Sequence, residues 1–428
     1  LGSATKVTNT LTLTNGTLTT PDFLTLASDN VNTSRVAEIT GGSITGNVVV
    51  ERFLPAGRKW RFLTAPITQS TPSKLNTTWK TIVDIVGPSG SPNLTQVKPF
   101  HNFLEYNSAG DSWTNVEDPN AIDLTGTTHN KAFGAFIPGP LATADNTSAD
   151  VTLSSTGALL TGNKSFTSSF ASGKYILIPN PYASPVNLET IFTGSTGINP
   201  LGTIYTWDPR LGGGAGTGGY ISIKRDGVNT FTITGGTTGQ TEVIQSGQAF
   251  FVEANAGTQS INFTEASKST SNINTVFGAG TGNTDLLRIG FNRYESSAPV
   301  VISEVLSRYS NNYNTAISKS EDAEKLWNNE ENIAIRRGNF SLSIESRPFI
   351  GASSDSIFLG LSSLRANTNY ALEFKPSNWD AGSKAYLIDK LLSTETLIDL
   401  NNTSFVHQFT STVATANDRF VVVFRGAT

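Results

Sequence analysis

Short stretches in which every second residue is apolar, interrupted by Asn-Gly and Gly-Gly pairs, begin this sequence and recur through it. In residues 5–26, valine and leucine alternate with threonine, and Asn15-Gly16 is a strong signal for a tight turn. An alternation with a period of two places one set of side chains on one face of a strand. The pattern therefore predicts an all-β fold with glycine and asparagine in its turns.

The first fifty residues contain two such cycles. The second cycle runs through Val36, Ile44 and Val48 and includes the pair Gly41-Gly42. Short strands between tight turns fold either as hairpins or as the rungs of a small β-solenoid, and the pattern leaves both alternatives open. We predict that residues 1–50 form a separate, solenoid-like segment of β-strands.

Two larger blocks follow this segment. Residues 51–268 combine longer strands with large aromatic residues, which most often fill the core of a sandwich. Residues 269–283 are rich in serine, threonine, asparagine and glycine and are predicted to be a linker. Residues 284–428 return to alternating strands. The prediction is therefore two β-sandwich domains, jelly-roll-like in character, at 51–268 and 284–428.

One short helix is predicted in the last domain. Ser318 followed by Glu321 has the spacing of a capping box, and Leu326 and Trp327 supply an apolar side. The acidic residues near its start suit the positive end of the helix dipole. We expect this helix to end near Asn328.

The 428 residues include no cysteine and no methionine. A chain of this composition has no disulfide, no thiolate nucleophile and no sulfur ligand for a metal, and it lacks the side chains that oxidants attack. It also begins at Leu1. We therefore predict that a secretory leader has been removed and that the mature protein is extracellular or on the cell surface.

Charge and hydropathy argue against two classes of partner. Charged residues make up 15% of the chain and the formal net charge is −4, so the clustered basic residues that nucleic-acid binding requires are missing. No segment approaches the ~18 apolar residues of a membrane span. We predict neither a nucleic-acid partner nor a membrane span.

Catalytic and metal-binding patterns are sparse. The three histidines, at 101, 129 and 407, have no zinc-ligand spacing, and no Gly-x-Ser-x-Gly turn occurs. We predict a protein that is not an enzyme and needs no cofactor. Asp111, Asp118 and Asp123 are candidate calcium ligands in the dense acidic stretch of the second block, although a solvated loop explains the same pattern.

Several segments resemble one class of secreted protein. They are residues 52–55 (RFLP), 178–185 (IPNPYASP), 206–209 (TWDP), 244–252 (IQSGQAFFV), 370–374 (YALEF), 385–389 (AYLID) and 417–420 (NDRF). These segments are similar to cell-surface proteins of the Bacteroidota that the type IX secretion system exports. The resemblance covers most of residues 48–428, and it implies the body of such a cargo without its C-terminal sorting domain. It also implies the type IX machinery as a partner during export.

The same resemblance singles out one serine. Asp355-Ser356-Ile357 matches the short pattern that this phylum O-glycosylates. The resemblance therefore implies Ser356 as a glycan acceptor, whereas an ordinary strand residue is the alternative.

Our preferred functional hypothesis is a structural or adhesive protein, the subunit of an extracellular filament. An N-terminal strand that carries Lys6, Val7, Leu11 and Leu13 is the candidate donor to a neighbouring copy by strand addition, although pairing within its own domain is the alternative. In this hypothesis the partners are copies of the same chain.

The alternative hypothesis is a non-catalytic glycan-binding accessory protein of the cell surface. Trp113, Trp207 and Tyr220 lie near polar or glycine-rich loops and are the candidate platform on which a sugar would stack. Surface polysaccharide would then be the partner.

Overall fold

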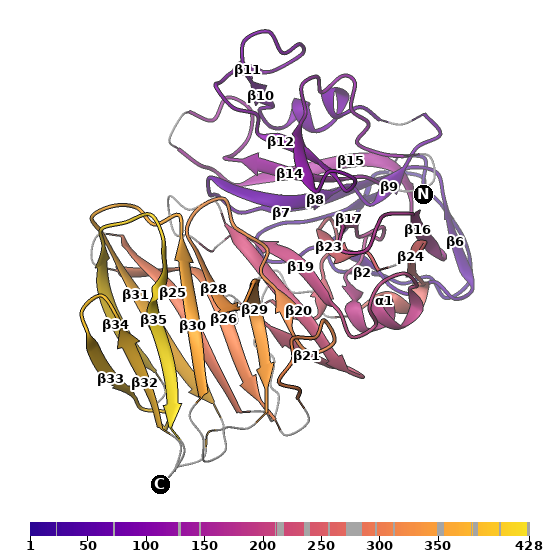
Figure 1. Cartoon of the computed structure of the whole chain (residues 1–428). Coiled ribbons are helices and arrows are strands. Elements are labelled where there is room, and N and C mark those ends of the chain that lie inside the picture. Colours follow the sequence, from indigo (N-terminus) through magenta and orange to yellow (C-terminus); the bar gives the residue numbers. More distant parts are fainter. Residues whose placement is uncertain are drawn as a thin grey trace. The chain divides into compact units, whose positions relative to one another are not determined.

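The computed structural model describes the chain except for residues 23, 72, 127–129, 145–146, 210, 212–217, 235–239, 256, 271–284, 296–297, 311–312, 349–354, 378, 380–383, 402–403 and 426–428. The described residues are almost all in strands, turns and loops (Figure 1). The predicted all-β fold is confirmed. The predicted linker at 269–283 lies almost wholly outside the described residues.

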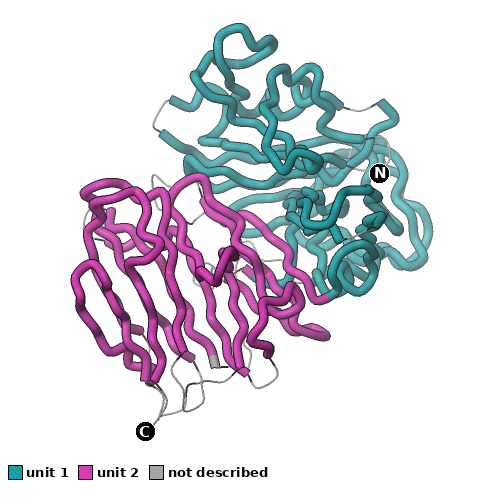
Figure 2. The backbone as a smooth tube through the Cα atoms, in the orientation of Figure 1, with its two compact units in different colours: residues 1–200, 241–277 teal, residues 201–240, 278–428 magenta. Residues whose placement is uncertain are grey.

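The chain forms two compact units (Figure 2). Unit 1 contains residues 1–200 and 241–277, and unit 2 contains residues 201–240 and 278–428. The units differ from the predicted domains in two ways. Residues 1–50 belong to the same unit as the segment that follows them. Residues 201–240, which were predicted to belong to the domain at 51–268, are part of unit 2 together with residues 278–428.

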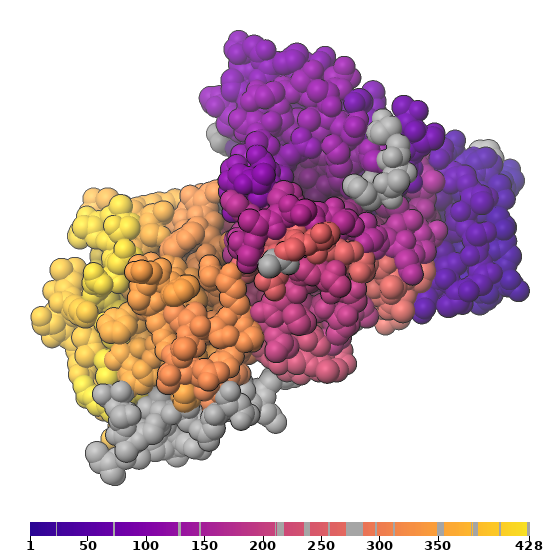
Figure 3. All heavy atoms as spheres, turned by 45° about the vertical axis from the view of Figure 1, so that its right-hand side comes forward, coloured from indigo at the N-terminus to yellow at the C-terminus, as the bar shows by residue number. Residues whose placement is uncertain are grey.

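The first fifty residues form a parallel β-solenoid. Its first turn contains β1 (Thr5–Val7), β2 (Thr10–Leu11) and β3 (Gly16–Thr19), and its second contains β4 (Leu24–Leu26), β5 (Arg35–Val36) and β6 (Gly42–Thr45). Each strand pairs in parallel with its counterpart one turn away, so the strands are rungs and not hairpins. Apolar side chains stack in ladders, such as Val7 on Leu26 and Leu26 on Val50. The solenoid lies at the surface in the space-filling view (indigo in Figure 3).

The third turn of the solenoid begins with β7 (Val48–Leu54), which connects it to the rest of unit 1. β7 is parallel to β4 on one edge and antiparallel to β15 (Val151–Leu159) on the other. β15 also pairs with β9 (Ile67–Thr68). A four-stranded antiparallel sheet has the order β13 (Ser112–Asn115), β12 (Phe103–Asn107), β14 (Ala132–Ile137) and β8 (Lys59–Thr64).

The core of unit 1 joins these sheets. Trp79 packs against Phe103 and Phe133, and its indole Nε1 donates to the hydroxyl of Ser155 on β15 at 3.0 Å. The remaining elements of unit 1 are η1 (Leu75–Thr77), η2 (Trp79–Thr81), β10 (Val86–Gly87), β11 (Gln96–Val97), β16 (Lys164–Ser168), β17 (Tyr175–Pro179), β18 (Val186–Asn187), α1 (Leu188–Gly194), β22 (Val243–Ile244), β23 (Ala249–Glu253), β24 (Gln259–Phe263) and η3 (Glu265–Ser267).

Unit 2 contains a small antiparallel meander and one large sheet. The meander is β19 (Thr203–Asp208), β20 (Gly219–Gly227) and β21 (Thr230–Ile233). The large sheet has the order β33 (Thr394–Ile398), β32 (Lys384–Asp389), β35 (Ala416–Arg425), β30 (Asp355–Ser362), β28 (Asn332–Arg337), β29 (Phe340–Arg347), β26 (Ala298–Tyr309), β25 (Asp285–Glu295), β31 (Thr368–Ser377) and β34 (Phe405–Ser411), and β27 (Ala323–Glu324) pairs with β29.

The large sheet curls until its two halves face each other. Phe409 of β34 lies 4.8 Å from Phe420 of β35, and Tyr309 of β26 lies 5.4 Å from Phe424 of β35, measured between ring centroids. Strands that are distant in the sheet order therefore share one apolar core. The meander packs on this sheet, where the hydroxyls of Ser222 and Ser343 are hydrogen-bonded at 2.8 Å.

The predicted helix at 318–329 is wrong. The segment makes a turn, in which the amides of Glu321 and Asp322 donate to the Ser318 carbonyl, and then enters β27. Its burial is the reverse of an amphipathic helix, because Asp322 and Lys325 are buried whereas Trp327 is 47% exposed. Among the described residues the α-helix is instead α1, in unit 1, where the Asn187 side chain accepts from the Glu189 amide.

Buried lysines make the stability of unit 2 dependent on pH. Burial lowers the pKa of Lys325 to about 8, and burial also lowers the pKa of Lys224 to about 8. Below pH 8 the folded state therefore holds two costly buried charges. Between pH 8 and the ordinary lysine pKa, the unfolded chain binds more protons than the folded chain, so stability rises with pH.

We expect Lys325→Met to reduce this rise. The free energy of unfolding of wild type should increase between pH 7.5 and pH 9.5, and the variant should lose about 2 kcal/mol of that increase. Urea denaturation at the two pH values measures the change in the free energy of unfolding, with the exposed Lys384→Met as the matched control. An unchanged pH dependence in Lys325→Met would contradict the buried charge.

Candidate functional site

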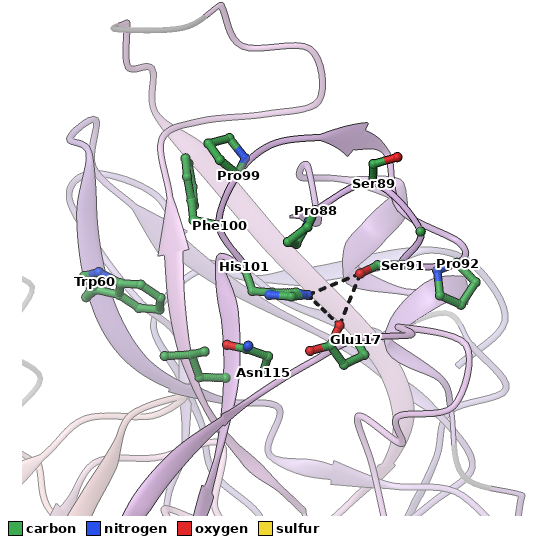
Figure 4. Close-up of a pocket in the computed structure, with 12 residues that line it drawn as sticks. Trp60, Pro88, Ser89, Ser91, Pro92, Pro99, Phe100, His101, Asn115 and Glu117 are labelled. Carbon is green, nitrogen blue, oxygen red and sulfur yellow. Dashed lines mark hydrogen bonds and ion pairs between the residues drawn. The ribbon is translucent and has the colours of Figure 1, made fainter.

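A wide pocket in unit 1 gathers aromatic and polar side chains (Figure 4). Its volume is about 810 Å³, within the range of known ligand pockets. The lining residues come from the segment 88–101, from β8 and β12, and from the end of β13 and the loop that follows it. They are Trp60, Pro88, Ser89, Gly90, Ser91, Pro92, Pro99, Phe100, His101, Leu104, Asn115 and Glu117.

The segment that forms most of the pocket is held at both of its ends. β10 and β11 pair in parallel, and the Lys98 amide donates to the Gly87 carbonyl at 2.8 Å. The Thr95 hydroxyl donates to the Ile85 carbonyl at 3.0 Å and accepts from the Ile85 amide at 2.9 Å. The loop between the two strands therefore has fixed anchor points.

Asn102 attaches this segment to the four-stranded sheet. It is buried, its side-chain oxygen accepts from the Val86 amide at 2.8 Å, and its Nδ2 donates to the carbonyls of Asp84 and Phe136 at 2.8 and 3.1 Å. One amide side chain thus links β10, β12 and β14. The neighbouring residue His101 is positioned by the same attachment.

A three-residue polar group lies at the centre of the pocket. His101 Nε2 lies 3.0 Å from a carboxylate oxygen of Glu117 and 3.5 Å from the Ser91 hydroxyl, which itself donates to Glu117 at 3.1 Å (Figure 4). The imidazole packs on Gly87, where a Cβ would come within 2.7 Å of the ring. Glycine is therefore required at that position for the ring to keep its place.

This group does not have the geometry of a catalytic triad. In a triad the serine and the carboxylate bind opposite nitrogens of the imidazole, so that one orients the ring while the other loses its proton. Here Ser91 and Glu117 both face Nε2. The arrangement offers donors and acceptors to a ligand and does not activate the serine.

Aromatic side chains form another wall of the pocket. Phe100 is 46% exposed, and Trp60 is half-buried with its ring 5.7 Å from that of Phe136. The sequence alone favoured core positions for both rings. For Phe100, the signal that could have found it is the set of prolines before it, Pro88, Pro92 and Pro99, which keeps the backbone out of regular strands. Trp60 lies in the regular strand β8 and has no such signal.

The candidate donor strand pairs within its own chain. Lys6 and Val7 lie in β1, Leu11 lies in β2, and Leu13 is half-buried between β2 and β3. All three strands of the first turn are bonded to the second turn. The segment is therefore the end rung of a solenoid and not a free arm.

The three rings of the candidate sugar platform belong to two units, Trp113 to unit 1 and Trp207 and Tyr220 to unit 2. Trp113 is half-buried against Phe62, Tyr106 and Phe251 of unit 1. Trp207 is only 5% exposed, and its ring lies edge-on to Tyr220, 4.9 Å away across β19 and β20. Packing in the core makes Trp207 unsuitable for stacking on a sugar.

The candidate calcium ligands are also held apart. Asp111 binds Lys174, Asp118 accepts from Asn93, and Asp123 binds Lys74. Burial opposes ionisation of Asp111, but hydrogen bonds from the Tyr175 amide and the Lys174 ammonium outweigh it and leave its pKa below the ordinary value. Across the described residues, no group of three or more histidine or acidic side chains could hold a metal ion. His129 lies outside that part of the chain.

Ser356 lies inside the large sheet of unit 2. It is half-buried in β30, opposite Val423 of β35, and its amide donates to the side chain of Asp355 at 2.7 Å. Asp355 also binds Arg347. Glycosylation of Ser356 stays a prediction.

The fold and the pocket together define an all-β protein with a short parallel solenoid at its start and a polar–aromatic pocket in the same unit. The chain belongs to the family described as a domain of unknown function (DUF8693), which it matches over residues 84–424. No curated protein and no solved structure matches it. In the described part of the chain, no helix has the length and hydropathy to cross a membrane.

The attachment of the pocket segment by Asn102 can be tested directly. Asn102→Ala leaves the Val86 amide and two carbonyls without their partner, so we expect the free energy of unfolding to fall by about 2 kcal/mol. The exposed Asn115→Ala, on the rim of the same pocket, should stay within about 0.5 kcal/mol of wild type. Urea denaturation compares the two, and equal losses would show that Asn102 has no special role.

Proposed function

We propose that the protein is a structural or adhesive component of the cell surface whose copies assemble by β-strand addition at the first turn of the solenoid. One observation carries the proposal. β1, β2 and β3 each pair on one edge with the second turn, and no described strand pairs with their other edge. An unpaired strand edge is a template for another chain.

Backbone hydrogen bonds show which peptide groups face the open edge. The Val7 carbonyl accepts from the Ala27 amide at 2.9 Å, and the Leu11 carbonyl accepts from the Ala37 amide at 2.9 Å. Successive peptide groups of a strand point to opposite sides. The N–H and C=O groups of Lys6 and Thr10 therefore point away from the second turn, where an added strand would bind them.

The apolar ladders support the same interpretation. Leu26 and Val36 of the second turn are 1% and 2% exposed, whereas Val7 and Leu11, which stack on them from the first turn, are only half-buried. The reason is that no described strand stacks on the first turn, where the Leu1 ammonium donates to the Thr19 carbonyl of β3 at 2.7 Å. A strand added there would bury these side chains as the first turn buries the second.

A filament needs a second, different edge for the first to bind. β33 of unit 2 is the outermost strand of its sheet, and Leu391, Leu392 and Leu397 in and beside it are 63%, 59% and 51% exposed. We assign the open edge of β33 as the partner of the first solenoid turn in the next copy. Contact between two different surfaces joins copies head to tail, which produces a filament when the rotation between copies does not close into a ring.

Composition and resemblance support the proposed location. A chain without cysteine or methionine has no side chain that an oxidising exterior would convert to a disulfide or a sulfoxide. The resemblance to type IX cargo proteins supports export by that machinery. The proposed partners are therefore the secretion machinery first and other copies of the chain afterwards.

Lys6→Pro tests the open edge. Proline removes the outward N–H of Lys6 while the bonds of β1 to β4 remain, so we expect filaments to be lost and the monomer to stay folded. The matched control is Lys6→Ala, which keeps the N–H and should assemble like wild type. Negative-stain micrographs and sedimentation of each variant measure the result. Filaments of Lys6→Pro that equal those of wild type would refute the proposal, as would a wild type that stays monomeric at high concentration.

A mixing experiment tests the assignment of β33. Leu397→Lys places a charge on the proposed partner edge, so this variant alone should not assemble. A mixture of Leu397→Lys with Lys6→Pro retains one intact surface of each kind and should form dimers but no longer species. Analytical ultracentrifugation distinguishes these outcomes. Filaments of Leu397→Lys alone would show that β33 is not the partner edge.

A further inference from the structure

We propose that the pocket of unit 1 binds a neutral saccharide, with Trp60 and Phe100 as the stacking wall and Ser91, His101 and Glu117 as the hydrogen-bonding group. This inference goes beyond assembly, because none of these residues belongs to the solenoid or to β33. It also differs from the platform predicted from sequence, whose rings are packed elsewhere.

The stacking wall suits the apolar face of a sugar ring. A pyranose presents C–H groups on its faces and hydroxyls around its rim, so it combines an aromatic contact with hydrogen bonds in the ring plane. Phe100 is 46% exposed and lines the pocket, so its ring is accessible to a ligand. In the view of Figure 4, Trp60 and Phe100 lie to one side of His101, and Ser91 and Glu117 lie to the other.

The polar group suits the rim of the sugar. The side chain of Glu117 is 62% exposed, while that of His101 is only 6% exposed and holds the carboxylate in place at 3.0 Å. A carboxylate has about four acceptor positions, so Glu117 can bind adjacent hydroxyls of a ligand and keep its contact with His101. The exposed Asn115 adds an amide that both donates and accepts.

The charge of the lining selects among saccharides. The lining residues include one carboxylate, that of Glu117, and no lysine or arginine. A sulfated or uronic-acid polymer would bring negative charge toward Glu117 without a cation to receive it. The pocket therefore favours neutral sugars.

The hydrogen-bonding groups of the pocket favour a saccharide over a proline-rich peptide. Peptides in the polyproline conformation dock on aromatic grooves, mostly through apolar contacts and backbone carbonyls. The centre of this pocket is instead a converging serine, imidazole and carboxylate, and a carboxylate cannot donate to a carbonyl. The peptide is accordingly an outcome that the experiment must exclude.

Affinity electrophoresis of the full chain in gels that contain xylan, mannan, laminarin or hydroxyethylcellulose tests the proposal. Titration calorimetry then measures the matching hexasaccharide and a decaproline peptide. We expect at least one neutral polysaccharide to retard the protein, and Phe100→Ala and Trp60→Ala to weaken its hexasaccharide roughly tenfold each. Glu117→Gln should weaken binding as well, since it removes an acceptor but keeps the shape of the side chain.

Matched controls come from exposed aromatic residues elsewhere. Phe340→Ala and Trp327→Ala remove rings that are 44% and 47% exposed in unit 2, and they should bind like wild type. Circular dichroism establishes that each variant is folded. Three outcomes would overturn the proposal: no retardation by any of the four polysaccharides, equal binding by the pocket and control variants, or binding of decaproline alone.

Discussion

The architecture of unit 1 depends on β7, a strand that carries a different kind of pairing on each edge. Along one edge it continues the parallel ladder of the solenoid by pairing with β4, and along the other it pairs antiparallel with β15. Val48 and Val50 of β7 therefore belong to the same core as Leu24 and Leu26 of the second turn and Leu153 of β15. The solenoid is an extension of this core. The first turn, whose outer edge no described strand pairs with, is therefore fixed through the second turn to β7.

The first solenoid turn and the pocket of unit 1 bind their proposed partners through different groups. The first solenoid turn offers main-chain groups, which bind any strand of suitable shape, so its selectivity must come from the side chains beside it. The pocket offers side chains, which are positioned by main-chain anchors and by the single buried amide of Asn102. Binding of a saccharide and assembly of copies can therefore be altered separately, by substitutions in residues that do not touch.

Contacts in the core of unit 2 explain why the predictions of a helix at 318–329 and of an exposed Trp207 were wrong. The segment 318–329 has the composition of a helix start, but Asp322 accepts from the Ser346 amide and Lys325 donates to the Ser303 hydroxyl inside unit 2. Those partners are distant in sequence, so no local pattern could reveal them. For the same reason Trp207 looked like a surface ring although it packs against Tyr220 in the core.

The strand content, the turns and the absence of sulfur chemistry follow from the sequence alone, because period-two alternation, Asn-Gly pairs and composition are local properties. Tertiary structure decided that the first strands are rungs. Val7 stacks on Leu26, Leu11 on Val36 and Leu18 on Ile44, and these unequal spacings hide any repeat. Tertiary structure also placed residues 201–240 in unit 2 and brought Ser91, His101 and Glu117 together. Contacts between distant segments decide such features, since each depends on the lengths and paths of the loops between them.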